Sequence, residues 1–221
     1  MTKSTRPTSP PVIGLIGSIG AGKSTVAQML ADAGCVVSDS DALARESFHD
    51  PAVRDQIIKW WGASLLDSQG KVDRSRIAEI VFPPVNPSAA QRLAADQERK
   101  RLEGLVHPWI HARRRALFAQ AAATAKAFVI DAPLLLESNI QGECDALLMV
   151  DAPLSLRLER VRTSRGWVSD ELIRRENSQM PLDLKRKVAH HIVNNDGSID
   201  SLRAQVAQIL SIILDSQPHH C

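Results

Sequence analysis

The stretch GLIGSIGAGKST, residues 14–25, places four glycines within nine residues, followed by a lysine and two hydroxyl side chains. Within it, residues 17–24 match the spacing G-x-x-x-x-G-K-[ST]. Glycine reaches positive φ angles and lets backbone N–H groups come close to an anion. A helix after such a loop adds unpaired N–H groups and the positive end of its dipole. Because an apolar run precedes the stretch and a helical pattern follows it, the stretch predicts a phosphate-binding loop.

The residue types of this loop have different tasks. Lys23 is expected to reach the β- and γ-phosphates of a nucleotide, and the hydroxyl of Ser24 is expected to hold Mg²⁺. The predicted nucleotide-binding residues are Gly17, Gly20, Ala21, Gly22, Lys23, Ser24 and Thr25. The loop predicts a protein that binds a nucleoside triphosphate. It leaves open whether the γ-phosphate passes to water, to a small molecule or nowhere.

The composition is that of a globular protein, with 221 residues, 44% hydrophobic and 24% charged, and a net charge of +2. A charge so close to balance does not favour nucleic acid as a partner. Three scattered cysteines argue against a disulfide framework. Residues 1–11 lack the apolar core of a signal peptide, and no apolar run approaches the roughly 18 residues of a membrane span. We therefore expect a soluble, cytoplasmic protein with a flexible tail at 1–11 and no membrane partner.

Short apolar runs alternate with helical patterns along the chain. The helix after the loop has apolar residues at the i, i+3, i+4, i+7 spacing up to Gly34, and a second apolar stripe runs from Ile199 to Ile213. Strands are predicted at 12–17, 35–39, 127–133, 146–153 and, more weakly, 190–195. Alternating strands and helices predict an α/β fold with a parallel sheet that is covered on both faces.

Residues 45–124 interrupt this alternation, because they show helical patterns and no convincing strand. We interpret them as a helical insertion between the second and third strands of the core. The core itself is then expected at 12–44 and 125–215.

Acidic residues follow several of the predicted strands, at the sheet edge where ligands bind in parallel sheets. These residues are Asp39, Asp41, Asp131 and Asp151. One of them is suited to hold a metal through water, and another to orient or deprotonate an attacking hydroxyl. An acidic residue after a strand also often caps the next helix. We expect a functional role for Asp39 or Asp41, leave Asp131 open between the two interpretations, and expect Asp151 to be a cap.

A group of arginines follows the fourth strand: Arg157, Arg160, Arg162 and Arg165. Arginine offers fixed positive geometry to a moving phosphoryl group, and a mobile segment that carries it excludes water. This favours a lid at 157–180, with a solvated helix face as the alternative.

The second basic run, residues 99–115, is interpreted as a solvated helix face. It contains His107 and His111, four residues apart, but no further ligand cluster that would indicate a metal site.

Six further elements accompany the loop in order along the chain: SDSDALAR (38–45), GKVDR (70–74), HPWI (107–110), PLLLE (133–137), QMPLDLKR (179–186) and NDG (195–197). The loop alone is generic, but the ordered set at this spacing is specific. With these elements the chain resembles the dephospho-coenzyme A kinase family over nearly all of residues 12–210.

The resemblance implies a phosphotransferase that uses ATP and Mg²⁺. Its acceptor would be the 3′-hydroxyl of the ribose of dephospho-CoA, a small molecule, in the last step of coenzyme A biosynthesis. The implied fold is a three-layer P-loop NTPase fold with a five-stranded parallel sheet, a helical acceptor-binding insertion at 45–124 and a lid. We expect a monomer or a weak homo-oligomer.

The resemblance also implies roles for single residues. Asp41 would be the base or orienter of the ribose hydroxyl, Asp39 would lie near the metal, and Asn195 would lie near the adenine of ATP. The implied catalytic residues are Lys23, Asp41, Arg160 and Arg165. The implied substrate-binding residues are Asp39, Arg45, Arg74, His107 and Glu137.

The chain departs from the family pattern at three places. Ser40 replaces the alanine of the family's D-A-D motif, and His190 stands where an acid is common. The spacing from Arg160 to Arg165 is one residue longer than usual, which leaves Arg162 as an alternative lid arginine.

Two other functions remain open at this point. Another small-molecule P-loop kinase, such as a nucleoside monophosphate kinase, would differ in its acceptor. A nucleotide-binding switch is suggested by DSQG (67–70), which matches D-x-x-G. That element does not end a convincing strand, however, and the chain has no N-K-x-D guanine motif.

Overall fold

The computed structural model describes residues 9–83 and 86–216. The chain forms two compact units: the first takes in the residues up to Asp39 and those from Phe118 onward, and the second is Ser40–Leu117. Most of the tail expected at 1–11 lies outside the described residues.

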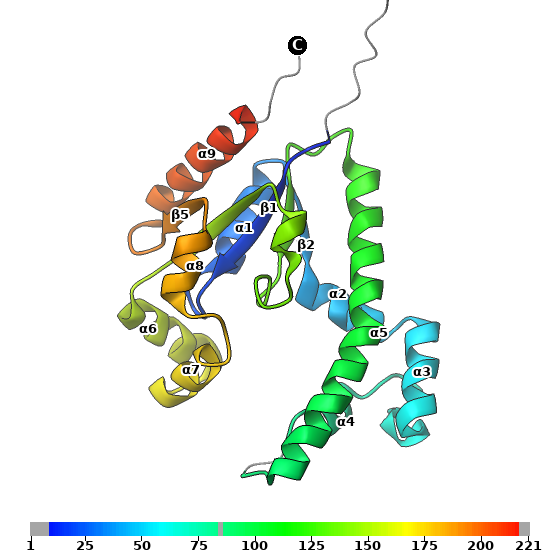
Figure 1. Cartoon of the computed structure of the whole chain (residues 1–221). Coiled ribbons are helices and arrows are strands. Elements are labelled where there is room, and N and C mark those ends of the chain that lie inside the picture. The colour runs from blue at the N-terminus through cyan, green and yellow to red at the C-terminus, as the bar shows by residue number, and fades with distance from the viewer. Residues whose placement is uncertain (1–8, 84–85, 217–221) are drawn as a thin grey trace, which may run out of the picture. The chain divides into compact units, whose positions relative to one another are not determined.

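The first unit is built on the predicted five-stranded parallel sheet, with the order β2-β3-β1-β4-β5 (Figure 1). Its strands are β1 (Val12–Gly17), β2 (Val36–Asp39), β3 (Phe128–Asp131), β4 (Ala146–Asp151) and β5 (His191–Asn194). β3 and β4 each end two residues before the expected boundary, because Pro133 and Pro153 have no N–H to join a ladder. The α/β fold class is therefore confirmed.

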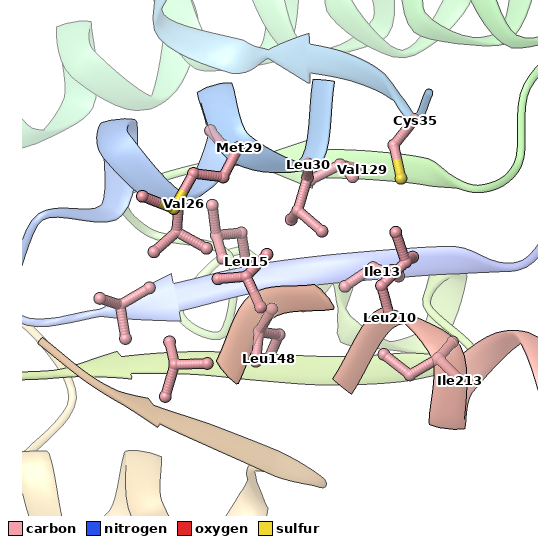
Figure 2. Packing of buried hydrophobic residues seen from close by; sticks show 14 of the residues in the cluster. Ile13, Leu15, Val26, Met29, Leu30, Cys35, Val129, Leu148, Leu210 and Ile213 are labelled. Atoms are coloured by element: carbon pink, nitrogen blue, oxygen red, sulfur yellow. The ribbon is translucent and has the colours of Figure 1, made fainter. Parts of the chain in front are cut away.

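Alternation along β1 and β4 sends side chains to both faces of the sheet, so each face has its own core. On one face, Ile13, Leu15 and Leu148 pack against α1 (Lys23–Asp32) and α9 (Ile199–Asp215), as Figure 2 shows. On the other face of the sheet, Ile16 and Met149 pack against α8 (Leu182–Val188) and against residues next to this helix. A strand buried on both faces has no room for polar positions, which explains its unbroken apolar sequence.

Several further helices belong to the first unit. They are η2 (Ile140–Glu143), α6 (Leu154–Arg165) and α7 (Ser169–Glu176). Helix α1 ends before Gly34, whose φ of 96° is the left-handed conformation common in the residue that follows a helix. Among the described residues, no helix has both the length and the apolar character that crossing a membrane requires.

The second unit is helical within its described residues, with one isolated bridge between Leu66 and Val72. Its elements are α2 (Ser40–Ser47), α3 (Pro51–Trp61), η1 (Ala63–Leu65), α4 (Arg74–Val81) and α5 (Ala89–Ala121), whose last residues belong to the first unit. The buried core of this unit consists of Val53, Ile57, Leu65, Ile77 and Val81.

A capping carboxylate joins α3 to α5 in the second unit. Asp50 accepts hydrogen bonds from the backbone N–H groups of Ala52 and Val53, and its other oxygen accepts one from the indole N–H of Trp109 at 2.9 Å. The bond from Trp109, followed by the backbone bonds, lowers the pKa of Asp50. Asp50 therefore fixes both the start of α3 and the position of α5 beside it.

Candidate active site

The predicted phosphate-binding loop lies between β1 and α1. Its backbone requires glycine, either because another backbone atom lies too close for a side chain or because the φ angle is positive. A side chain at Gly17 would place its Cβ 2.7 Å from the backbone oxygen of Val150 on β4. Gly20 and Gly22 have φ angles of 76° and 95°, which L residues rarely adopt. Gly22 is also the N-cap of α1, and it leaves the first N–H groups of that helix without a side-chain cap. Such N–H groups are suited to bind phosphate.

Two glycines allow a direct test of the loop geometry. Gly22 and Gly166 both have positive φ, but a Cβ at Gly22 would lie 2.1 Å from Nδ2 of Asn195, whereas a Cβ at Gly166 meets nothing within 4 Å. Both Gly→Ala variants should lose about 1–2 kcal/mol from backbone strain. Only Gly22→Ala should also lower ATP affinity, by about tenfold or more, because its contact displaces Asn195 from the loop.

The measurements are thermal unfolding and ATP titration calorimetry on both variants. Equal ATP affinity in Gly22→Ala and Gly166→Ala would contradict a binding role for this loop conformation.

Lys23 and two strand-end carboxylates share one sheet edge. Asp39 on β2 is in register with Asp131 on β3, which is in turn in register with Leu15 on β1. The Lys23 ammonium forms an ion pair with Asp131, whose side chain is largely buried. Ser24, in the first turn of α1, is exposed. The first unit thus brings together one cation, two acids and a helix N-terminus, as parallel topology predicts.

Arg160 and Asn195 lie beside the loop. Nη2 of Arg160 donates to the backbone oxygen of Asn195 at 3.0 Å, and Nη1 lies 3.4 Å from the backbone oxygen of Ala21. The Asn195 amide donates to the same Ala21 oxygen at 2.8 Å. Two residues predicted for lid and adenine roles are therefore joined at the loop, although they are 35 positions apart in the sequence.

The other arginines after β4 have different surroundings. Arg157 is buried, pairs with Glu176 and donates to the Ala152 backbone oxygen at 3.1 Å, so it joins α6 to α7. Arg165 lies over the ring of Trp167 at 4.7 Å, and Arg175 lies over the same ring at 4.3 Å. Arg165 thus makes a cation–π contact with Trp167, and its predicted role at the phosphates stays a prediction.

Glu137, predicted to bind substrate, has two partners from the segment around α8. Its Oε1 accepts the backbone N–H of Met180 at 2.6 Å and lies 3.7 Å from Nζ of Lys185. The Lys185 side chain is only 4% exposed. Burial, partly offset by Glu137, lowers the pKa of Lys185.

Two polar residues at the strand ends have structural partners. Asp151 accepts from the Ala152 backbone N–H at 2.9 Å and from Nε of Arg186 at 2.9 Å. The helix cap expected at Asp151 is wrong, because α6 has Pro153 as its N-cap and no side-chain cap. His190 donates its backbone N–H to Leu147 and accepts the Leu147 backbone N–H at Nδ1, at 3.0 Å and 2.8 Å. His190 therefore extends the pairing of β4 and β5.

The remaining predicted residues belong to the second unit. Asp41 and Arg45 are exposed on α2, Arg74 is the exposed first residue of α4, and His107 is exposed on α5. Among the residues that the structure describes, no three or more metal-ligating side chains form a group, and His107 is therefore not part of such a group.

Comparison with known proteins settles the family. The model of the dephospho-CoA kinase family matches residues 11–201, which is most of the chain. The chain belongs to the dephospho-CoA kinase family. Its relatives include the dephospho-CoA kinase of Thermobifida fusca, 37% identical over 199 residues, covering 89% of this chain and 93% of the relative. The enzyme of Deinococcus radiodurans is 37% identical over 210 residues, covering 93% and 95%.

Solved structures place this dephospho-CoA kinase family member among P-loop kinase folds. The crystal structure of TT1252 from Thermus thermophilus has a TM-score of 0.74 at 32% identity, and the match covers 93% of this chain and 98% of that one. A dephospho-CoA kinase from Campylobacter jejuni has a TM-score of 0.60 at 23% identity, covering 92% and 97%, which supports the fold.

The structure adds to what the sequence indicates at two positions. Asp131 was left open, and only its contact with Lys23 favours a functional place over a helix cap. Lys185 lies within the element QMPLDLKR, where the sequence indicates no role for it, because a lysine in an amphipathic pattern gives no sign of burial. The burial of Lys185 follows from how α8 packs on the sheet.

Proposed function

We propose that this chain transfers the γ-phosphoryl group of ATP to the 3′-hydroxyl of the ribose of dephospho-CoA, which gives coenzyme A in the last step of its biosynthesis. The family match over residues 11–201 supports the reaction. The observation that carries it is the complete phosphate-binding loop with Lys23 paired to a strand-end carboxylate.

The phosphates of ATP would lie over the N-terminus of α1. Backbone N–H groups of the loop would surround the β-phosphate, and Lys23 would exchange its contact with Asp131 for the β- and γ-oxygens. Arg160, already beside Ala21, would add positive charge where the phosphoryl group moves. Fixed charges of this kind lower the barrier because they need no rearrangement during the reaction.

The oxygen donors at this edge fit a magnesium ion. Ser24 offers an exposed hydroxyl, and Asp39 and Asp131 offer neighbouring carboxylates on paired strands. Magnesium is usually bound by one or two carboxylates, together with phosphate oxygens and waters. Ser24 and one of these acids would hold Mg²⁺, which would neutralise charge on the β- and γ-oxygens.

The acceptor hydroxyl requires a group that aligns it for in-line attack. Asp41 follows Asp39 by two residues and lies in the first turn of α2. By the family resemblance, Asp41 would orient the ribose hydroxyl and accept its proton. Arg45, Arg74 and His107, all exposed in the second unit, would bind other parts of dephospho-CoA.

The deciding experiment is an acceptor comparison. Purified protein with ATP and Mg²⁺ is offered dephospho-CoA, AMP, CMP and adenosine, and the phosphorylated product is quantified for each acceptor. We expect kcat/KM for dephospho-CoA to exceed that for the others by about 10³-fold or more, because a truncated acceptor lacks the groups that Arg45, Arg74 and His107 would bind, and binding energy from remote parts of a substrate supports the transition state.

Preference for a nucleotide acceptor would refute the proposal and indicate a nucleoside monophosphate kinase. ATP or GTP hydrolysis with no transfer would refute it in favour of a switch. A cytoplasmic location and a monomeric or weakly associated state, without nucleic acid, stay predictions from the sequence.

A further inference from the structure

We propose that Lys185 is a second phosphate-binding lysine, which donates to a phosphoryl oxygen of the polyphosphate bound at the loop. The proposal rests on the proposed function for the identity of that polyphosphate. It concerns a residue of α8, far in sequence from the loop.

The position of Lys185 beside the loop is the first support. A pocket of about 290 Å³ is lined by Ser18 of the loop together with Glu176, Gln179 and Lys185. One water takes up about 30 Å³, so the pocket has room for a phosphoryl group. The charge of Lys23 also contributes, after burial, to lowering the pKa of Lys185, which puts the two ammonium groups within electrostatic reach of each other.

The surroundings of Lys185 are the second support. Its ammonium donates to Oε1 of Gln179 at 2.9 Å, and Glu137 lies at 3.7 Å, beyond ordinary hydrogen-bond distance. An ammonium has three donors, and a buried one is costly to leave incompletely bonded. Lys185 lines the pocket, and the nearby charge of Lys23 repels its ammonium, whereas Glu137 and Glu176 attract it. A polyphosphate would remove that repulsion and occupy the remaining donors.

A structural alternative exists, because Lys185 also connects Glu137 to the segment that contains Gln179. In that case Lys185 would hold this segment in place without touching phosphate. The two interpretations differ in whether the affinity for a bare polyphosphate depends on Lys185.

The test measures inorganic tripolyphosphate binding by titration calorimetry for the wild type, Lys185→Met and Lys185→Arg. Lys187→Met is the matched control, because Lys187 is exposed on the same helix. Losing a charge-assisted hydrogen bond should weaken tripolyphosphate binding about 10- to 100-fold in Lys185→Met. Lys185→Arg should recover part of the affinity and of kcat, and Lys187→Met should match the wild type.

Circular dichroism checks that each variant is folded. If Lys185→Met does not fold, the double variant Glu137→Gln/Lys185→Met is used in its place, because it removes both charges of the pair. A folded variant without Lys185 that binds tripolyphosphate like the wild type would overturn the proposal, even if its turnover were low. If the wild-type protein does not phosphorylate dephospho-CoA, the proposed function is refuted instead. The comparison of tripolyphosphate affinities stays valid in that case.

Discussion

Lys23→Met should reduce kcat for phosphoryl transfer by about 10³-fold while the protein stays folded. In the proposed mechanism the Lys23 ammonium contacts the β- and γ-phosphate oxygens, and methionine keeps the length of the side chain without its charge. The variant also leaves Asp131 without its cation beside the incoming phosphates. ATP affinity should therefore fall as well, since a largely buried carboxylate repels the triphosphate.

A double-mutant cycle separates these two effects. Asp131→Asn in the Lys23→Met background removes the repulsive charge, so ATP affinity should partly recover while kcat stays low. Lys187→Met, with its exposed lysine, controls for the loss of one positive charge. Turnover within threefold of the wild type in folded Lys23→Met would exclude Lys23 from transition-state stabilisation.

Asp41→Asn should lower kcat by about 10²- to 10⁴-fold, with the KM for ATP changed only slightly. Asparagine keeps the shape of the side chain but accepts no proton, so the ribose hydroxyl would lose its base. Asp41 lies on α2 in the second unit and is exposed, so its replacement should leave the protein folded. Steady-state kinetics at saturating dephospho-CoA provide the measurement.

Two further variants make this result specific. Asp55→Asn replaces another exposed carboxylate of the second unit, 65% exposed, and should keep full activity. Asp131→Asn should mainly alter ATP binding through Lys23, which distinguishes a phosphate-side acid from the acceptor-side one. Near-normal turnover of Asp41→Asn would remove Asp41 from the mechanism.

The secondary structure of the core follows from short-range patterns, which explains why it could be predicted. Strands buried on both faces are unbroken apolar runs, and the loop needs glycine at positions of positive φ such as Gly20 and Gly22. The ends of the strands were less predictable, because they depend on where the hydrogen bonds between neighbouring strands stop. In β3 and β4 these bonds stop before Pro133 and Pro153.

The sequence by itself determined the phosphate-binding loop, the parallel α/β core and the family, because each depends on residue types at fixed spacing. Only the tertiary structure decided which polar and charged side chains meet. It paired Lys23 with Asp131, set Arg160 beside Asn195, and buried Lys185 near Glu137. Such contacts join positions far apart in the chain, and they arise from how helices pack on the sheet, which local patterns do not encode.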